Sequence, residues 1–367
     1  MVSAADPNLT EGLIEGLTQG LNGAPDLARL NTALAPRLGA AKITGVRVEP
    51  IGTGQMAESR RLRLSFSEPC DVPMTIIAKF PSADLGSRAT GKATRCYEVE
   101  ASFYRDLRDA LDVHAPHCHY VERNDGTDDF LLLLEDFAPC HQGDQITGCN
   151  INEARASIDE LVRLHGPLWN SPLLPTLGWL NRSSPDQRLA SYGLMQMVFP
   201  GFMERYRDRL TPQARTIGDE FARDAGNYSS RVAPHSTVVH GDFRLDNLLF
   251  TDTGRVGVVD FQTVTHACGA LDLAYFIGAG LSTDVRRGHE RELVQRWVDG
   301  LQGYNVTLGF DEAWLEYRRF TFAGYMMAVI ASMIVKQTER GDEMFMAMAN
   351  RHAQHATDLD SLAVVRG

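Results

Sequence analysis

The hydrophobic pattern changes its period along the chain. In the first third, short apolar or alternating runs predict β-strands. These runs are residues 43–51, 61–66, 74–80 and 131–134. From about residue 150 the apolar residues recur at helical spacing, which predicts helices such as 284–303, 311–336 and 340–357, with Pro200 as a break. The pattern therefore predicts an α+β protein whose strands come first.

Residues 8–40 also carry helical periodicity, with Leu13, Ile14, Leu17 and Leu21 on one face. We expect residues 1–40 to form a helical extension that packs without contributing chemistry. The uncharged run at 320–335 is shorter than the roughly 20 residues that span a bilayer. It is expected to be a buried helix, so no membrane partner is predicted.

The most informative segment covers residues 240–262. Two apolar runs, 248–250 and 256–259, flank a turn that contains Gly254, which predicts an antiparallel hairpin. A hairpin brings its open ends together, so Asn247, before the first strand, should lie beside Asp260, after the second. An amide oxygen beside a carboxylate suits Mg²⁺, which takes its other ligands from water and substrate phosphates.

Asp242 precedes Asn247 by five residues, on the loop that leads into the hairpin. A base, an amide ligand and a metal carboxylate in this order form the catalytic core of protein-kinase-type phosphoryl transfer. We therefore predict that Asp242 is the catalytic base and that Asn247 and Asp260 are the metal ligands.

The motif His-Gly-Asp-x-x-x-x-Asn, followed by Asp-Phe-Gln, resembles the aminoglycoside phosphotransferase and choline kinase superfamily, and most of all its ecdysteroid-kinase-like branch. Protein kinases have Arg where Gly241 stands and Gly where Gln262 stands, so both departures favour small-molecule kinases. The resemblance covers roughly residues 45–335. It implies a two-lobed protein-kinase-like fold, with a small antiparallel-sheet N-lobe and a mostly helical C-lobe. It also implies that Asp272 braces the catalytic loop. His165 is expected to be structural, because a histidine in such a helix is more often structural than catalytic.

Lys79 ends an apolar strand, where a lysine is costly unless an anion meets it. It is expected to position the ATP phosphates together with a helix glutamate. Glu100 matches the resembled family's pattern, and Glu98 is the competitor, about 200° around the helix. Gly52 and Gly54, between two predicted strands, are expected to bring backbone N–H groups to the phosphates.

The apolar run 131–134 leads into Glu135-Asp136-Phe137, which resembles the hinge between the lobes in the family. There the carbonyl of Glu135 and the amide of Phe137 would bind adenine. Residues 86–93 nearly match a P-loop, but Ala93 replaces the hydroxyl that would hold Mg²⁺, so we predict a mobile loop instead. The histidines around Cys118 suggest zinc, yet a full set of ligands is not evident.

The 367-residue chain has a net charge of −11 and a pI near 5.5, which argues against nucleic acid as a partner. Six scattered cysteines without a Cys-x-x-Cys pair, and an N-terminus without signal-peptide character, lead us to expect a cytoplasmic protein. The sequence leaves the oligomeric state open.

The predicted organisation is an extension at 1–40, a nucleotide-binding N-lobe at 41–137, and a catalytic and acceptor-binding C-lobe at 138–367. The predicted reaction is ATP- and Mg²⁺-dependent transfer of the γ-phosphoryl group to a hydroxyl of a small molecule. Two alternatives stay open: an aminoglycoside O-phosphotransferase and a non-catalytic nucleotide-binding protein. A set of apolar residues could line the acceptor pocket: Phe199, Phe202, Met203, Tyr275, Phe276 and Met326.

Overall fold

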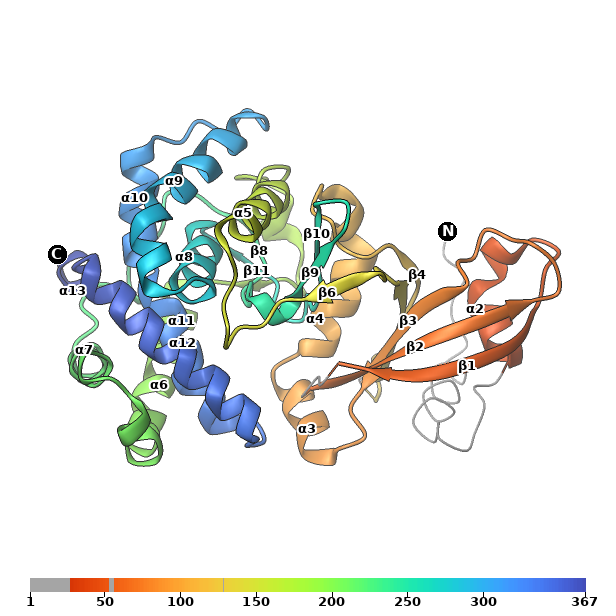
Figure 1. Cartoon of the computed structure of the whole chain (residues 1–367), viewed down its shortest axis with the longest axis horizontal. Coiled ribbons are helices and arrows are strands. Elements are labelled where there is room, and N and C mark those ends of the chain that lie inside the picture. The colour runs from red at the N-terminus through yellow and green to blue at the C-terminus, as the bar shows by residue number, and fades with distance from the viewer. Residues whose placement is uncertain (1–26, 53–55, 128) are drawn as a thin grey trace. The chain divides into compact units, whose positions relative to one another are not determined.

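The structure is a computed structural model that describes residues 27–52, 56–127 and 129–367. Its chain divides into two compact units, most of whose elements are labelled in Figure 1. Unit 1 contains the residues up to Asp109 together with Ala115–Ala138, and unit 2 contains Ala110–His114 and Pro139–Gly367. Most of the predicted N-terminal extension, residues 1–26, lies outside the described residues.

Unit 1 is built on a five-stranded sheet in the order β1-β2-β3-β5-β4, in which every neighbouring pair is antiparallel. Its elements are α2 (Leu27–Leu38), β1 (Ile43–Ile51), β2 (Ala57–Phe66), β3 (Thr75–Pro81), α3 (Leu85–Ala93), α4 (Cys96–Ser102), β4 (Cys118–Asn124) and β5 (Asp129–Glu135). Leu30 and Leu34 of α2 are buried in one core with Leu62 and Ile76 of the sheet. The predicted antiparallel sheet is confirmed.

Unit 2 is mostly helical and holds two small sheets, ordered β10-β9-β6 and β7-β11-β8. Its strands are β6 (Cys140–Gln142), β7 (Asn181–Arg182), β8 (Thr237–Val239), β9 (Leu248–Thr251), β10 (Val256–Val258) and β11 (Thr265–Ala267). Its helices are α5 (Ile151–His165), α6 (Pro185–Tyr206), α7 (Pro212–Arg223), α8 (Ala270–Gly280), α9 (Thr283–Gln302), α10 (Phe310–Arg319), α11 (Thr321–Ile334), α12 (Glu339–Asp358) and α13 (Ser361–Arg366).

Two helix predictions for unit 2 are wrong in detail. Helix α6 continues through Pro200, because Pro200 and Gln196 are both exposed and the carbonyl that loses its partner can bond to water. The predicted helix 311–336 is two helices, α10 and α11, separated at Phe320. The buried 320–335 helix is otherwise confirmed, since α11 places Phe322 in the core, stacked 4.0 Å from Phe221.

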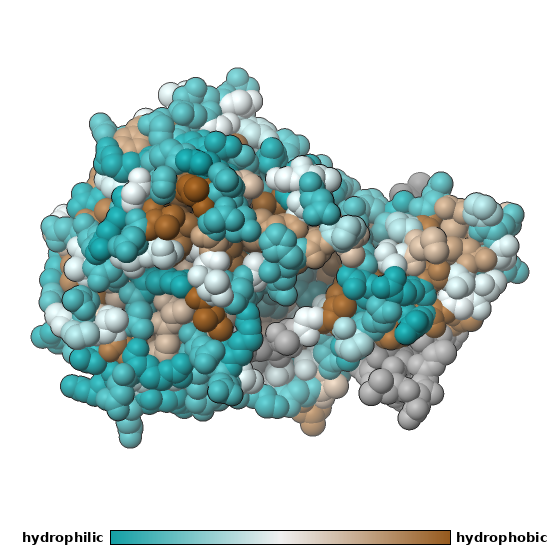
Figure 2. Space-filling model, in the orientation of Figure 1, coloured by the Kyte–Doolittle hydropathy of each residue, from teal (hydrophilic) through white to brown (hydrophobic). Residues whose placement is uncertain are grey.

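The face of the molecule seen in Figure 2 is mostly hydrophilic, and its hydrophobic residues form small, separate patches. Within the described residues, no helix combines the length and the apolar character that a membrane crossing requires.

Candidate active site

The predicted hairpin is present in unit 2. Strands β9 and β10 pair antiparallel, with the last residue of β10 opposite the first of β9. Beyond this pair, the N–H of Val259 donates to the main-chain oxygen of Asn247 at 3.0 Å. Asn247 is therefore bonded to Val259 at the open end of the predicted hairpin, and Asp260 is the next residue after Val259.

The backbone that leads to Asp242 is held by one buried carboxylate. Oδ2 of Asp272 accepts the N–H of His240 at 2.7 Å, and Oδ1 accepts the N–H of Gly241 at 2.9 Å. Gly241 has φ +82°, and a Cβ there would lie 2.6 Å from the main-chain oxygen of Thr263, so only glycine fits. The predicted bracing role of Asp272 is confirmed.

Asp272 is itself oriented by a buried chain of hydrogen bonds. The indole Nε1 of Trp297, which can only donate, lies 3.1 Å from Nδ1 of His165. Nδ1 is therefore the acceptor, and Nε2 of His165 carries the proton toward Oδ2 of Asp272, 3.3 Å away. Trp297, His165 and Asp272 are each at most 1% exposed. Sequence reasoning assigned His165 a structural role but missed Trp297, for which the helical pattern gave no signal.

The carboxylate of Asp242 has three side-chain donors. Nε of Arg244 donates to Oδ2 at 3.0 Å, Nδ2 of Asn247 donates to Oδ2 at 3.1 Å, and the hydroxyl of Tyr275 donates to Oδ1 at 2.8 Å. Burial, followed by the charge of Asp242, raises the pKa of Tyr275 well above that of an ordinary phenol, so the hydroxyl stays protonated. The direction of the Asp242 side chain is thereby fixed.

Arg244 was not predicted, although it stands only two residues after Asp242. Burial acts to lower its pKa, yet the carboxylates of Asp242 and Asp246 outweigh burial and raise the pKa above its ordinary value. The guanidinium therefore stays charged and holds two carboxylates at once, since Nη1 also donates to Asp246 at 3.0 Å.

Asp260 has an unusual backbone for a residue other than glycine, with φ +69°. Its Oδ2 accepts a hydrogen bond from Nε2 of Gln262 at 3.3 Å. Strained positions of this kind persist where the surrounding structure determines them, and they concentrate at functional sites.

In unit 1, Lys79 of β3 pairs with Glu100 of α4, Nζ to Oε1, at 2.7 Å. The two side chains are 11% and 2% exposed, so the pair is largely buried. Glu98 instead pairs with Arg95 at 2.7 Å. Of the two candidate glutamates, the structure therefore brings Glu100 to Lys79.

The other predicted nucleotide contacts lie near strand ends of unit 1. Gly52 follows β1 with φ +68°, a conformation that favours glycine, whereas Gly54 lies outside the described residues. Glu135 ends β5, and its N–H donates to the main-chain oxygen of His117 at 2.8 Å. Phe137 follows two residues later, next to the boundary of the unit at Ala138.

Two expectations are corrected by the structure. The predicted mobile loop at 86–93 is part of helix α3, which Asp84 caps by accepting the N–H of Ser87 at 2.8 Å. The apolar residues proposed for an acceptor pocket are mostly core: Phe199, Phe202, Tyr275, Phe276 and Met326 are at most 6% exposed, and only Met203 is partly buried.

Across the described residues, no group of three or more His, Cys, Asp or Glu side chains is arranged to hold a metal ion. The rings of His117 and His119 lie 4.9 Å apart, without further ligands in such a group. The zinc hypothesis therefore has no support. An Mg²⁺ site needs fewer protein ligands, because water and phosphate supply the rest.

Comparisons with known proteins concern the family and the fold of the chain. The sequence model of a family described as "Phosphotransferase enzyme family" (APH) matches residues 95–316. The structure of the GDP and kanamycin complex of APH(2")-IIia is similar with a TM-score of 0.52 and 13% identity, over 90% of this chain and 98% of that one. The GDP complex of wild-type aminoglycoside 2'-phosphotransferase-IIIa has a TM-score of 0.51 and 13% identity, over 90% and 99%. Among curated proteins, no match is found.

Proposed function

This chain belongs to the APH phosphotransferase enzyme family, and on that basis we propose that it transfers the γ-phosphoryl group of ATP to a hydroxyl of a small molecule. The observation that carries the proposal is the array of Asp242, Asn247 and Asp260 on one braced loop and hairpin of unit 2. Each residue type matches one task of kinase-type phosphoryl transfer.

Asp242 is proposed to orient the acceptor hydroxyl and to take its proton. Arg244 and Tyr275 support this role, because together they hold both carboxylate oxygens in one direction. The braced backbone of His240 and Gly241 supports it as well, since a positioned base loses little entropy at the moment of reaction.

The donor set of Asn247 and Asp260 fits a magnesium ion. Nδ2 of Asn247 is engaged by the main-chain oxygen of Asp242 at 2.9 Å and by its Oδ2 at 3.1 Å, which leaves Oδ1 as the atom for a cation. Amide and carboxylate oxygens are the hard ligands that Mg²⁺ prefers. When bound, the ion would neutralise charge on the β- and γ-phosphates.

Lys79 is proposed to hold the α- and β-phosphates, with Glu100 fixing the direction of its ammonium group. Gly52 is proposed to contribute backbone N–H groups, and the backbone of Glu135 and Phe137 to bind adenine. The choice of ATP follows from the sequence resemblance. The GDP complexes of the two structural relatives make GTP the competitor to test.

For the acceptor we propose a bulky uncharged alcohol, the class that the ecdysteroid-kinase-like resemblance implies, rather than an aminoglycoside. The support is electrostatic. A polycationic acceptor needs carboxylates without cationic partners near Asp242. Asp246, which shares Arg244 with Asp242, is paired with Arg244 and with Arg340, both at 3.0 Å. Arg340 also reaches Asp144 at 3.3 Å. Asp246 and Asp144 are therefore already paired with arginines of this chain and are not available to bind the amino groups of an aminoglycoside.

Calorimetric titration of ATP tests the metal assignment. We expect Mg²⁺ to tighten ATP binding in the wild type and to have little effect in Asp260→Ala. Asp252→Ala, an exposed carboxylate in the turn of the same hairpin, is the matched control. Equal ATP affinity with and without Mg²⁺ in all three proteins would remove the assignment.

ADP release measured across a panel of alcohols tests the reaction itself. We expect turnover with at least one bulky uncharged alcohol and none with kanamycin. Turnover with kanamycin would overturn the acceptor class. Nucleotide binding without phosphoryl transfer to any alcohol would instead favour the non-catalytic alternative.

A further inference from the structure

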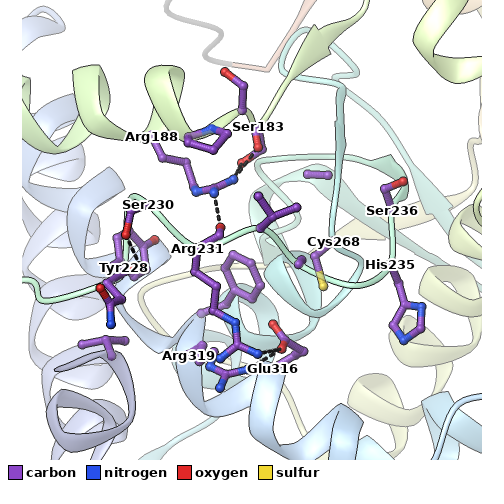
Figure 3. A pocket seen from close by; sticks show the side chains of 18 of the residues that line it. Ser183, Arg188, Tyr228, Ser230, Arg231, His235, Ser236, Cys268, Glu316 and Arg319 are labelled. Atoms are coloured by element: carbon purple, nitrogen blue, oxygen red, sulfur yellow. Dashed lines mark hydrogen bonds and ion pairs between the residues drawn. The ribbon is translucent and has the colours of Figure 1, made fainter. Parts of the chain in front are cut away.

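A cavity of about 580 Å³ lies in unit 2, away from the catalytic loop. Figure 3 shows most of its side chains. The lining comes from β7, the start of α6, the segment before β8, the end of β11, the end of α10 and the C-terminal residues. Its volume is within the range of sites that hold small organic ligands. We call it the arginine pocket, after Arg182, Arg188, Arg231 and Arg319.

The arginine pocket and the catalytic loop lie at opposite ends of the same two strands. Ser236, in the pocket, directly precedes β8, and His240 directly follows it. Strand β11 runs antiparallel beside β8, with Ala267, in the pocket, opposite Thr237. Three residues of extended strand span about 10 Å. A ligand in the arginine pocket would therefore be separate from the catalytic machinery.

The positive charge of the pocket exceeds its negative charge. Its lining side chains include four guanidinium groups and the carboxylate of Glu316, and the C-terminal residue Gly367 lines it as well, so the cations still outnumber the anions. Oε1 of Glu316 is shared by Nη1 of Arg319 at 2.5 Å and Nη2 of Arg231 at 3.4 Å (Figure 3). The buried Nε of Arg319 has no hydrogen-bond acceptor among the described residues. The carboxylate of Glu316 is thus the shared counter-charge of two arginines and leaves Nε of Arg319 without an acceptor among the described residues.

Arg188 forms no ion pair with a carboxylate among the described residues. It donates to the main-chain oxygens of Ser183 and Arg231 and to Oγ of Ser183 at 3.2 Å, all of them neutral groups (Figure 3). It also stands in the first turn of α6, whose N-terminus carries a positive partial charge. Burial lowers the pKa of Arg188, the direction expected for a cation short of counter-charge.

We propose that the arginine pocket binds an organic phosphate. A phosphate dianion with several oxygens can engage several guanidinium groups at once and matches the excess of positive charge. The hydroxyl group of Ser184 adds a donor, and Pro185 and Phe320 add an apolar wall for the organic part. The inference does not depend on the proposed phosphoryl transfer.

Calorimetry with phenyl phosphate as the probe tests the proposal on the full chain. We expect binding to the wild type that Arg188→Gln weakens roughly 10-fold or more, because a charge-assisted hydrogen bond is lost. Arg223→Gln, at an exposed position of α7 outside the pocket, is the matched control and should bind normally. Lys79→Met should also bind normally, since Lys79 lies in unit 1.

Three results would overturn the proposal. Phenyl phosphate binding that Lys79→Met abolishes and Arg188→Gln leaves intact would place the probe in the nucleotide site. Equal affinity for benzoate would contradict the phosphate class. No binding by the wild type would contradict the site itself. If Arg188→Gln does not fold, Arg182→Gln, at an exposed position of the pocket, replaces it and should weaken binding in the same direction.

Discussion

The two ends of strands β8 and β11 balance their charges in different ways. At the catalytic end, each oxygen of Asp272 receives a backbone N–H, and both oxygens of Asp242 receive side-chain donors. At the other end, the arginine pocket sets four guanidinium groups against the carboxylate of Glu316. At the catalytic end, donors of the chain itself bind the carboxylate oxygens. At the pocket end, the described residues supply fewer carboxylates than guanidinium groups.

The two ends therefore suit different roles: the first holds the Asp242 carboxylate in one orientation, and the second attracts an anionic ligand. Asp242 has the direction of its carboxylate fixed by Arg244, Asn247 and Tyr275, so its orientation is established during folding. Within the described residues, the hydrogen-bond acceptors of Arg188 are neutral, so part of its electrostatic free energy is available to a ligand. The four predictions below test the two ends in turn.

The largest effect is expected from Asp242→Asn, which keeps the size of the side chain but cannot take a proton. We expect kcat to fall about 10²–10⁴-fold with near-normal affinity for Mg-ATP. Steady-state kinetics with an identified acceptor, alongside calorimetry, measures both, and Asp252→Asn is the control. Full kcat would refute the base, and loss of ATP binding would place Asp242 among the metal ligands.

Asp272→Asn tests whether the catalytic end is satisfied as described. The amide replaces one acceptor oxygen with a donor that faces N–H groups of the loop or of His165. We expect the free energy of unfolding to fall by about 1–3 kcal/mol, because a buried donor loses its acceptor. Urea unfolding measures this change. A stability equal to that of wild type would show that the brace is not energetically important.

Tyr275→Phe removes a single hydrogen bond, the one to Oδ1 of Asp242. We expect kcat to fall about 2- to 10-fold, the equivalent of about 0.5–1.5 kcal/mol, with the KM for nucleotide unchanged. A fall as large as that of Asp242→Asn would mean that Tyr275 has a chemical role of its own. An unchanged kcat would mean that Arg244 and Asn247 suffice to orient the carboxylate.

The smallest effect is expected at the pocket end. Burial, followed by the charge of Arg182, lowers the pKa of His266, since a neighbouring cation disfavours the imidazolium. Arg182→Gln should therefore raise the pKa of His266, and so should phenyl phosphate in the wild type. NMR titration of the imidazole measures both shifts. A pKa that stays the same or falls would contradict the excess of positive charge in the pocket.

Several features of the site could be predicted because they depend on local sequence. Pairing of the two hairpin strands is enough to bring Asn247 next to Val259, the residue before Asp260. The composition of the turn predicts this pairing. Lys79 stands out because a cation at the end of an apolar strand needs a partner. The bracing by Asp272 came from the family resemblance, and the structure confirms it with two hydrogen bonds.

Other features could not be predicted, because they join residues far apart in the chain. Tyr275 lies 33 positions after Asp242, and Trp297 lies 132 positions after His165, so no periodicity links either pair. Periodicity also missed the break between α10 and α11. It identified Phe199 and Phe202 as apolar but could not show that they face the core. Burial is a property of packing, and packing follows only from the assembled fold.

The sequence by itself determined the change from strands to helices, the hairpin, and the order of Asp242, Asn247 and Asp260, because each depends on residues within a few positions of one another. The tertiary structure alone decided which glutamate meets Lys79, which donors orient Asp242, and that Arg188 and Arg231 share a cavity. Electrostatic partners are chosen by distance in space, and distance in space is set only when the elements pack.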